Sequence, residues 1–236
     1  MQNWGSTGRP GLVGGGLSRR AALAGLLAAG AFALPGCTTM MRRDGTTDIV
    51  RRLLELSTQR AFARLVQPDG FWDSSVARIN LPVLFGKPGS AMAGILRSEV
   101  FREKLQHHLN NLAEDGARKA APVVAEAVRS ISIPDALALL HGERTAATTY
   151  LRQAMGPALV NAMIPALDEV MRIGSDPVLG QAIAALSGVD LAAAAHALAI
   201  EADNAIWYEI GASEADIRAD PASSNDPLLI AGLKAL

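Results

Sequence analysis

The feature that most constrains the fold is the spacing of the apolar residues, which recur every three or four positions from about residue 48 to the end of the chain. This repeat is typical of helices that bury one face. No run shows the apolar–polar alternation of a half-buried strand. The sequence therefore predicts an all-α fold, a single helical bundle, in which abundant alanine lets helices approach closely.

Capping and turn residues mark the ends of the predicted helices. Residues 46–48 (Thr-Thr-Asp) offer N-caps to a first helix, which Pro-Asp-Gly at 68–70 ends. Gly116 is expected to break the next apolar run into two helices. Residues 132–135 (Ser-Ile-Pro-Asp) predict a cap with proline in the first turn of a short helix, which Gly142 closes.

Three further segments complete the expected bundle. The clearest amphipathic helix runs over 159–171, and Pro165 is expected to kink it. A later helix is predicted over 189–209, and Asp226 with Pro227 caps a final short helix. The loop over 67–90, after the first helix, is rich in proline and glycine, but its apolar residues predict that it packs against the bundle.

The first 36 residues have the three parts of a bacterial export signal. Residues 1–20 carry arginine and no acid, and residues 21–33 are uncharged and weakly apolar. At about 1.5 Å per residue this run is too short to cross a hydrocarbon core of ~30 Å. Arg19 and Arg20, after a serine, resemble the twin-arginine signal. We expect export by that route, with the general route as the alternative.

Cys37 is the expected site of lipid attachment. Residues 34–37 (Leu-Pro-Gly-Cys) resemble a lipobox, where bacterial lipoproteins are acylated and then cut before the cysteine. Two or more acyl chains would hold the protein stably on a membrane. Thr38 stands where Asp would indicate inner-membrane retention, which favours the periplasmic face of the outer membrane. The alternative is an ordinary signal peptide cut near Cys37, which would leave a free thiol.

These boundaries predict a signal peptide over 1–36, a tether over 37–47 and one helical domain over 48–236. Cleavage would remove three of the 22 basic residues and none of the 23 acids, so the mature net charge would be −4. Because no basic cluster remains, we expect no nucleic acid as a partner. With a single cysteine there is no disulfide, so packing alone must stabilise the domain.

No pattern typical of catalysis or of a cofactor site is present. Glu103 and His107 could supply two metal ligands from one helix, but zinc requires three or four. His107 is expected on a solvated face, and the adjacent His108 at the border of the core. His196 and Asp203 lie two turns apart, about 10 Å, which is too far for an acid–base pair. We therefore predict no metal, no cofactor and no catalytic residue.

Three acids lie near glycines: Asp69, Glu114 and Asp115. Loop turns and helix ends explain acids in such positions without catalysis.

The loop aromatics Phe71 and Trp72 are the strongest candidates for contact with a partner. Aromatic side chains on a loop can anchor a protein or a membrane surface. The alternative, which we favour because the domain has few aromatic residues, is that they plug the end of the bundle.

A second candidate set lies near residue 150. Thr148, Thr149, Tyr150 and Arg152 could line a polar pocket for an anion, since arginine offers a bidentate fork. Equally, Arg152 could pair with an acid such as Glu201 and lock two helices together, and we favour this structural role. An enzyme that uses Tyr150, Arg152 and an acid is a further alternative, which requires these groups to meet in one cleft.

Several short motifs occur in an order typical of one bacterial family. They are the segments at 69–71, 79–82, 111–114, 121–122, 135–137, 142–152, 203–205 and 214–221. Together they resemble the family called domain of unknown function 4197. The resemblance covers about 50–230 and departs at the tail, 231–236, where the family usually ends in a Lys-Lys-Val-Phe-Gly-like segment. It implies an exported helical bundle, often lipid-anchored, and it implies no activity.

These features predict a lipid-anchored protein on the periplasmic side, most directly a binding or envelope-support module whose partner is another envelope protein. One alternative is a carrier that holds an apolar ligand in a cavity between helices, lined by residues such as Met163 and Leu167, with the 67–90 loop as its lid. A scaffold with a solid core and a large apolar surface patch is another.

Overall fold

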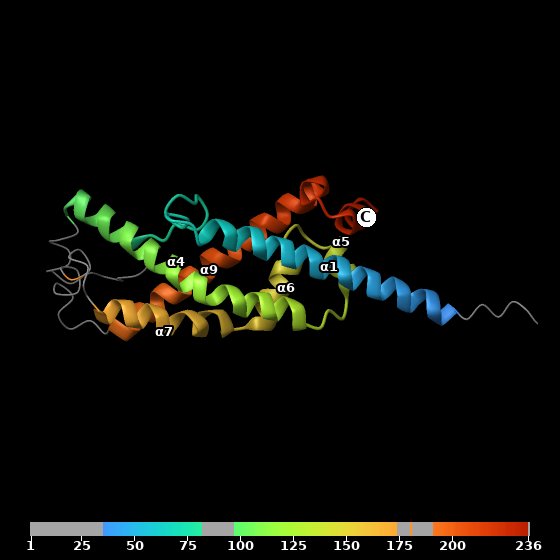
Figure 1. The fold of residues 1–236 in the computed structure, drawn as a ribbon, viewed down its shortest axis with the longest axis horizontal. Coiled ribbons are helices and arrows are strands. Elements are labelled where there is room, and N and C mark those ends of the chain that lie inside the picture. The colour runs from blue at the N-terminus through green and yellow to red at the C-terminus, as the bar shows by residue number, and fades with distance from the viewer. Residues whose placement is uncertain (1–34, 82–96, 174–179, 181–190, 236) are drawn as a thin grey trace, which may run out of the picture. The chain divides into compact units, whose positions relative to one another are not determined.

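The computed structural model describes residues 35–81, 97–173, 180 and 191–235, and all regular structure within them is helical. This confirms the all-α prediction. The elements are α1 (Pro35–Leu65), α4 (Glu99–Ser130), α5 (Ala136–His141), α6 (Ala146–Met155), α7 (Ala158–Ile173), α9 (Leu191–Ala219), the 3₁₀ helix η1 (Pro221–Ser224) and α10 (Pro227–Lys234) (Figure 1). Contacts divide the chain into the compact units Met1–Thr39 and Met40–Leu236. None of the helices in the described ranges is long and apolar enough to cross a membrane.

The centre of the bundle consists of α4, α7 and α9. α4 packs along α7 and α9, and α7 packs along α9. Figure 1 shows α4 and α7 running lengthwise beside each other. Their facing sides bury apolar residues without exposed surface: Leu105, Leu159, Met163, Leu167, Leu198 and Ile206. The helix predicted over 189–209 ends ten residues later than expected, at Ala219, because buried Ile210 and Ile217 continue its apolar stripe.

α1 begins earlier than predicted. Residues 46–48, which we expected to be an N-cap, lie inside a helix that starts at Pro35, so this prediction was wrong. Threonine and aspartate cost less than about 1 kcal/mol each in a helix interior, so a cap residue permits a helix to begin there without requiring it. Residues 37–47, assigned to the tether, are helical. The predicted end before Pro68 is confirmed, since α1 stops at Leu65.

α4 is one continuous helix of 32 residues, so the predicted break at Gly116 was wrong. Glycine in a helix costs about 1 kcal/mol relative to alanine. Both halves of α4 pack against the bundle, through Leu109 and Val124 among others, and this burial outweighs the cost.

The same geometry predicts that Gly116→Ala stabilises the protein. A β-carbon at this position would lie 3.6 Å from Leu167 and Met163, an ordinary van der Waals contact. The free energy of unfolding should therefore rise by about 0.5–1 kcal/mol, because alanine lowers the entropy of the unfolded chain. Urea denaturation measures this change. The matched control is Gly142→Ala, whose β-carbon would lie 2.8 Å from that of Ala146 and should destabilise. A lower midpoint for Gly116→Ala would contradict the prediction.

The caps of the short helices agree with the sequence in part. The N-cap of α5 is Asp135, which accepts a hydrogen bond from the Ala138 N–H at 3.0 Å. We had predicted Pro134 in the first turn of this helix, but it lies before the cap. The aspartate is the cap because its side chain reaches the free N–H groups itself. Gly142 closes α5 and Asp226 caps α10, both as expected.

The described part of the predicted loop packs against the bundle, as expected. Phe71 is fully buried, and Ala77, Ile79 and Leu81 are nearly so. The buried amide of Asn110 on α4 holds this segment by accepting from the Ile79 N–H at 2.8 Å and donating to its carbonyl at 3.1 Å. The remainder of the predicted loop, 82–90, lies outside the described residues.

Candidate functional site

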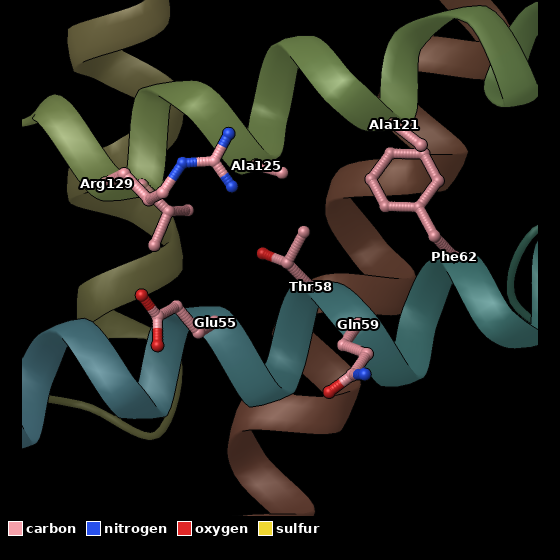
Figure 2. A pocket seen from close by; sticks show the side chains of 8 residues that line it. Glu55, Thr58, Gln59, Phe62, Ala121, Ala125 and Arg129 are labelled. Carbon is pink, nitrogen blue, oxygen red and sulfur yellow. The ribbon is translucent and has the colours of Figure 1, made fainter.

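A groove of about 390 Å³ lies between α1 and α4 (Figure 2). Its lining consists of Glu55, Thr58, Gln59 and Phe62 from α1 and Ala121, Ala125, Val128 and Arg129 from α4. The four α1 residues recur at intervals of three and four, so they share one face of the helix. The alanines on the α4 side are too short to fill the space. The volume falls in the range of small-molecule sites, roughly 300–1,000 Å³.

Thr58 places an unsatisfied hydroxyl in this groove. The residue is only 5% exposed, and its Oγ1 has no hydrogen-bond partner within the described ranges. Its neighbour Ser57 is equally buried, but the Ser57 hydroxyl donates to the Leu53 carbonyl at 2.6 Å. Figure 2 shows the Thr58 side chain pointing from α1 into the space toward α4. A buried hydroxyl without a partner costs about 1–3 kcal/mol, which a ligand could recover.

The rim of the groove carries one unbalanced charge. Arg129 donates to Glu126 through Nε at 3.2 Å and Nη2 at 2.7 Å, so its charge is paired. Glu55 takes part in no ion pair with any described residue. The free charge at the rim is therefore negative.

Arg51 holds α1 against the end of α4 and so sets one boundary of the groove. Its guanidinium donates to the Val128 carbonyl at 3.4 Å and to the Ile131 carbonyl at 3.1 Å. A cation at a helix C-terminus pairs with carbonyls that the last turn leaves free. Sequence reasoning did not identify Arg51, Glu55 or Thr58. The only available signal was polar spacing on one face of the first helix.

The structure separates the two loop aromatics. Phe71 belongs to the core, which agrees with the plugging role that we favoured. Trp72 is half-buried, with its ring 4.9 Å from that of His107 and 4.4 Å from the Arg78 guanidinium carbon. Neither residue lines the groove.

His107 is partly covered, whereas we had expected a solvated face. Its Nε2 lies 2.7 Å from Oδ1 of Asp69, because the segment after α1 folds back over α4. That return cannot be read from helical spacing. Within the described ranges, no three His, Cys, Asp or Glu side chains gather as a metal site requires.

Arg152 does join two helices, but not through the acid that we named. Its Nη2 donates to Oδ2 of Asp203 at 3.1 Å and to Oδ1 of Asn204 at 2.5 Å. Glu201 was the wrong partner, because residues two positions apart lie on nearly opposite sides of a helix. Asp203 also accepts from the Trp207 indole at 2.9 Å.

The other residues of that set do not converge with Arg152. The Thr148 hydroxyl donates to Glu214 at 2.6 Å, and the Tyr150 hydroxyl donates to the Ser132 carbonyl. A cleft of about 300 Å³ is lined by Thr148 and Arg152 but not by Tyr150. The convergence that the enzyme alternative requires is therefore not found in the described part of the chain.

Glu114 is buried in the middle of α4, so placing it at a turn or helix end was wrong. Burial raises the pKa of its carboxyl, and the opposing effects of the Phe71 and Gly70 N–H groups and of Arg118 are smaller. Only the return of the 66–81 segment over α4 makes this site, so no local pattern could reveal it.

The contributions of Asp203 and Asp226 to the free energy of unfolding should change with pH in opposite directions. Burial raises the pKa of Asp203 against the hydrogen bond from Trp207 and the charge of Arg152. The folded state thus holds this proton more tightly, and the associated stability is present at low pH and lost as pH rises through the folded pKa. The unfolding free energy of the wild type minus that of Asp203→Asn should therefore decrease as the pH rises from the ordinary range of an aspartate pKa through the raised pKa of the folded state. Urea denaturation at each pH measures it.

Asp226→Asn is the matched control. Burial acts to raise the pKa of Asp226, but the hydrogen bonds from the Leu229 N–H, Arg52 and the Leu228 N–H together lower it. The stability that Asp226 contributes is present above its unfolded pKa and is lost as the pH falls. The unfolding free energy of the wild type minus that of Asp226→Asn should therefore increase with pH. Slopes of equal sign for the two variants would contradict the assignment.

The predicted export signal, including Arg19 and Arg20, lies outside the described residues. Cys37 is the third residue of α1.

Comparison with known proteins places the chain in one family. No curated protein and no solved structure matches it at a significant level. A family model described as a protein of unknown function (DUF4197) matches residues 41–231, which is most of the chain. The residues that carried the resemblance in the sequence lie within this match. The chain therefore belongs to the DUF4197 family.

Proposed function

We propose that this protein is a binding protein that holds a small amphipathic molecule in the groove between α1 and α4. The observation that carries the proposal is the Thr58 hydroxyl, which is buried and without a partner among the described residues. Phe62, Ala121 and Val128 supply apolar walls beside it. A mostly apolar pocket with few polar groups is typical of small-molecule sites.

Binding fits the lining better than catalysis does. A nucleophilic hydroxyl requires a base within hydrogen-bond reach. Within the described lining, no hydrogen bond joins the Thr58 hydroxyl to a base. The carrier alternative had placed the ligand beside Met163 and Leu167, but both are fully buried and pack near Gly116. The groove on α1 is the better-supported location.

We also propose that the protein acts on the periplasmic side, attached to a membrane by lipid on Cys37. Support comes from residues 1–37 alone: the paired arginines, the uncharged run and the lipobox-like segment before the cysteine. An anchored carrier would meet amphipathic molecules at the membrane surface from which they leave.

Thr58→Val tests the proposed function, because it removes the hydroxyl and keeps the shape. The free protein should become more stable by about 1 kcal/mol, since an unsatisfied buried polar group is lost. Binding of decanol, a probe with an alkyl body and one hydroxyl, should weaken about fivefold with the lost hydrogen bond. Urea denaturation and isothermal titration calorimetry give the two readouts.

Two further variants define the site. Ser57→Ala should leave decanol binding unchanged, because the Ser57 hydroxyl is already bonded within α1. Ala125→Leu should block binding by filling the groove from the α4 side. Decanol binding that responds to neither Ala125→Leu nor Thr58→Val would place the site elsewhere and refute the proposal.

A further inference from the structure

If the proposed function holds, the polar residues that line the groove also indicate the charge of its ligand. Glu55 and Thr58 are three residues apart on α1, so their β-carbons lie about 5–6 Å apart on one face. The Thr58 oxygen has no partner among the described residues, and the Glu55 carboxylate has no ion pair there. A buried hydroxyl oxygen and an exposed carboxylate therefore lie on the same face of α1, and neither is paired with a described protein group.

Arg129 is the only cation among the described lining residues, and it donates to neither of these oxygens. Arg129 stands on the opposite wall, and Glu126 takes two of its N–H groups. Arg129 keeps three further N–H donors, but an anionic ligand that reached them would lie near the carboxylates of Glu126 and Glu55. A cationic ligand would not be repelled by these carboxylates.

We propose that the ligand is an amphipathic primary amine, with an unbranched alkyl body. An ammonium group has three N–H donors and no acceptor, so one group can donate both to the Glu55 carboxylate and to Thr58 Oγ1. The alkyl body then lies against Phe62, Ala121 and Val128. The groove of about 390 Å³ lies near the lower end of the range for small-molecule sites, roughly 300–1,000 Å³. This matches an alkylamine of medium length.

The test compares three probes of equal chain length, decylamine, decanol and decanoate, on the purified full chain by isothermal titration calorimetry. Measurements at about pH 7 keep the amine protonated and decanoate ionised. Decylamine should bind about fivefold more tightly than decanol, the effect expected for a partly exposed ion pair. Decanoate should bind least tightly.

Glu55→Gln should abolish the preference for the amine over decanol. Glu143→Gln is the matched control, because it removes the same charge from an exposed residue between α5 and α6 and should change nothing. Raising the salt concentration should reduce the amine preference in the wild type only.

The outcomes separate the two proposals. Equal binding of amine and decanol, or an amine preference that survives Glu55→Gln, overturns the cationic ligand and leaves the groove as a binding site. Tightest binding of decanoate overturns it as well and assigns the charge recognition to Arg129. If none of the three probes binds, the proposed function fails, and this inference fails with it.

Discussion

Glu214→Ala is expected to lower the free energy of unfolding by about 3–5 kcal/mol, a large part of the stability of a single domain. Glu214 is fully buried on α9 and serves as the N-terminal cap of another helix, α6. Its carboxylate accepts from the Ala147 N–H at 3.1 Å, from the Thr148 N–H at 2.7 Å and from the Thr148 hydroxyl at 2.6 Å.

The same carboxylate also neutralises Arg218, from which it accepts at 2.8 Å. Arg218 in turn donates to the Leu139 and Leu140 carbonyls, both at 2.9 Å. Alanine would leave the N–H groups at the start of α6 without an acceptor and a largely buried guanidinium without a counter-charge. Unsatisfied buried groups carry their full desolvation cost, which is the reason for the large effect.

Circular dichroism during urea denaturation measures this loss. Glu143→Ala is the control, because Glu143 is exposed and its removal should change stability by less than about 0.5 kcal/mol. Glu214→Gln should fall between the two, since one oxygen can still accept but the charge beside Arg218 is gone. If Glu214→Ala cost no more than Glu143→Ala, the tertiary cap would have no energetic role.

Cys37→Ser should abolish acylation and, because acylation precedes cleavage, should keep residues 1–36 attached to the protein. Without the thiol no diacylglyceryl group can be attached, and each buried CH₂ of an acyl chain contributes about 0.8 kcal/mol to membrane binding. Two chains make attachment effectively stable, so the wild type should sediment with membranes. Mass spectrometry of the intact protein, expressed as the full chain in a bacterium with two membranes, should show the acyl groups on the wild type alone.

Thr38→Ser keeps the cysteine and should remain acylated and membrane-bound. A wild type that begins at an unmodified residue, or a Cys37→Ser protein that still carries acyl groups, would refute the anchor. Replacement of Arg19 and Arg20 by lysine addresses the export route separately, since precursor should then accumulate inside the cell if the twin-arginine route is used.

Much of the helical content could be predicted from the sequence, because each apolar stripe is a local pattern. Val50, Leu53, Leu54, Phe62 and Leu65 recur at helical spacing along α1, and all are buried. Asp226 caps α10 because its acceptor oxygen and the free N–H groups lie within three residues of each other. Features that depend on so few neighbouring residues need no knowledge of the fold.

Local signals failed where tertiary packing outweighed them. Gly116 and residues 46–48 marked helix ends that do not exist, because burial of the flanking residues contributes more than the propensity of one or a few positions costs. The candidate groove was likewise not predicted. Whether the Thr58 hydroxyl has a hydrogen-bond partner depends on which side chains of α4 lie across the groove. Two of those side chains are alanines, which cannot form a hydrogen bond.

The helical class, the family motifs and the expected export signal could be read from the sequence, because each is a pattern of residues near one another along the chain. The packing of the helices sets the partners: Asp203 for Arg152, Glu214 for the start of α6, and Arg51 for the end of α4. These pairs are separated by 51 to 80 residues. Which side chains meet over such separations depends on how the helices pack against one another, and no single helix contains that information.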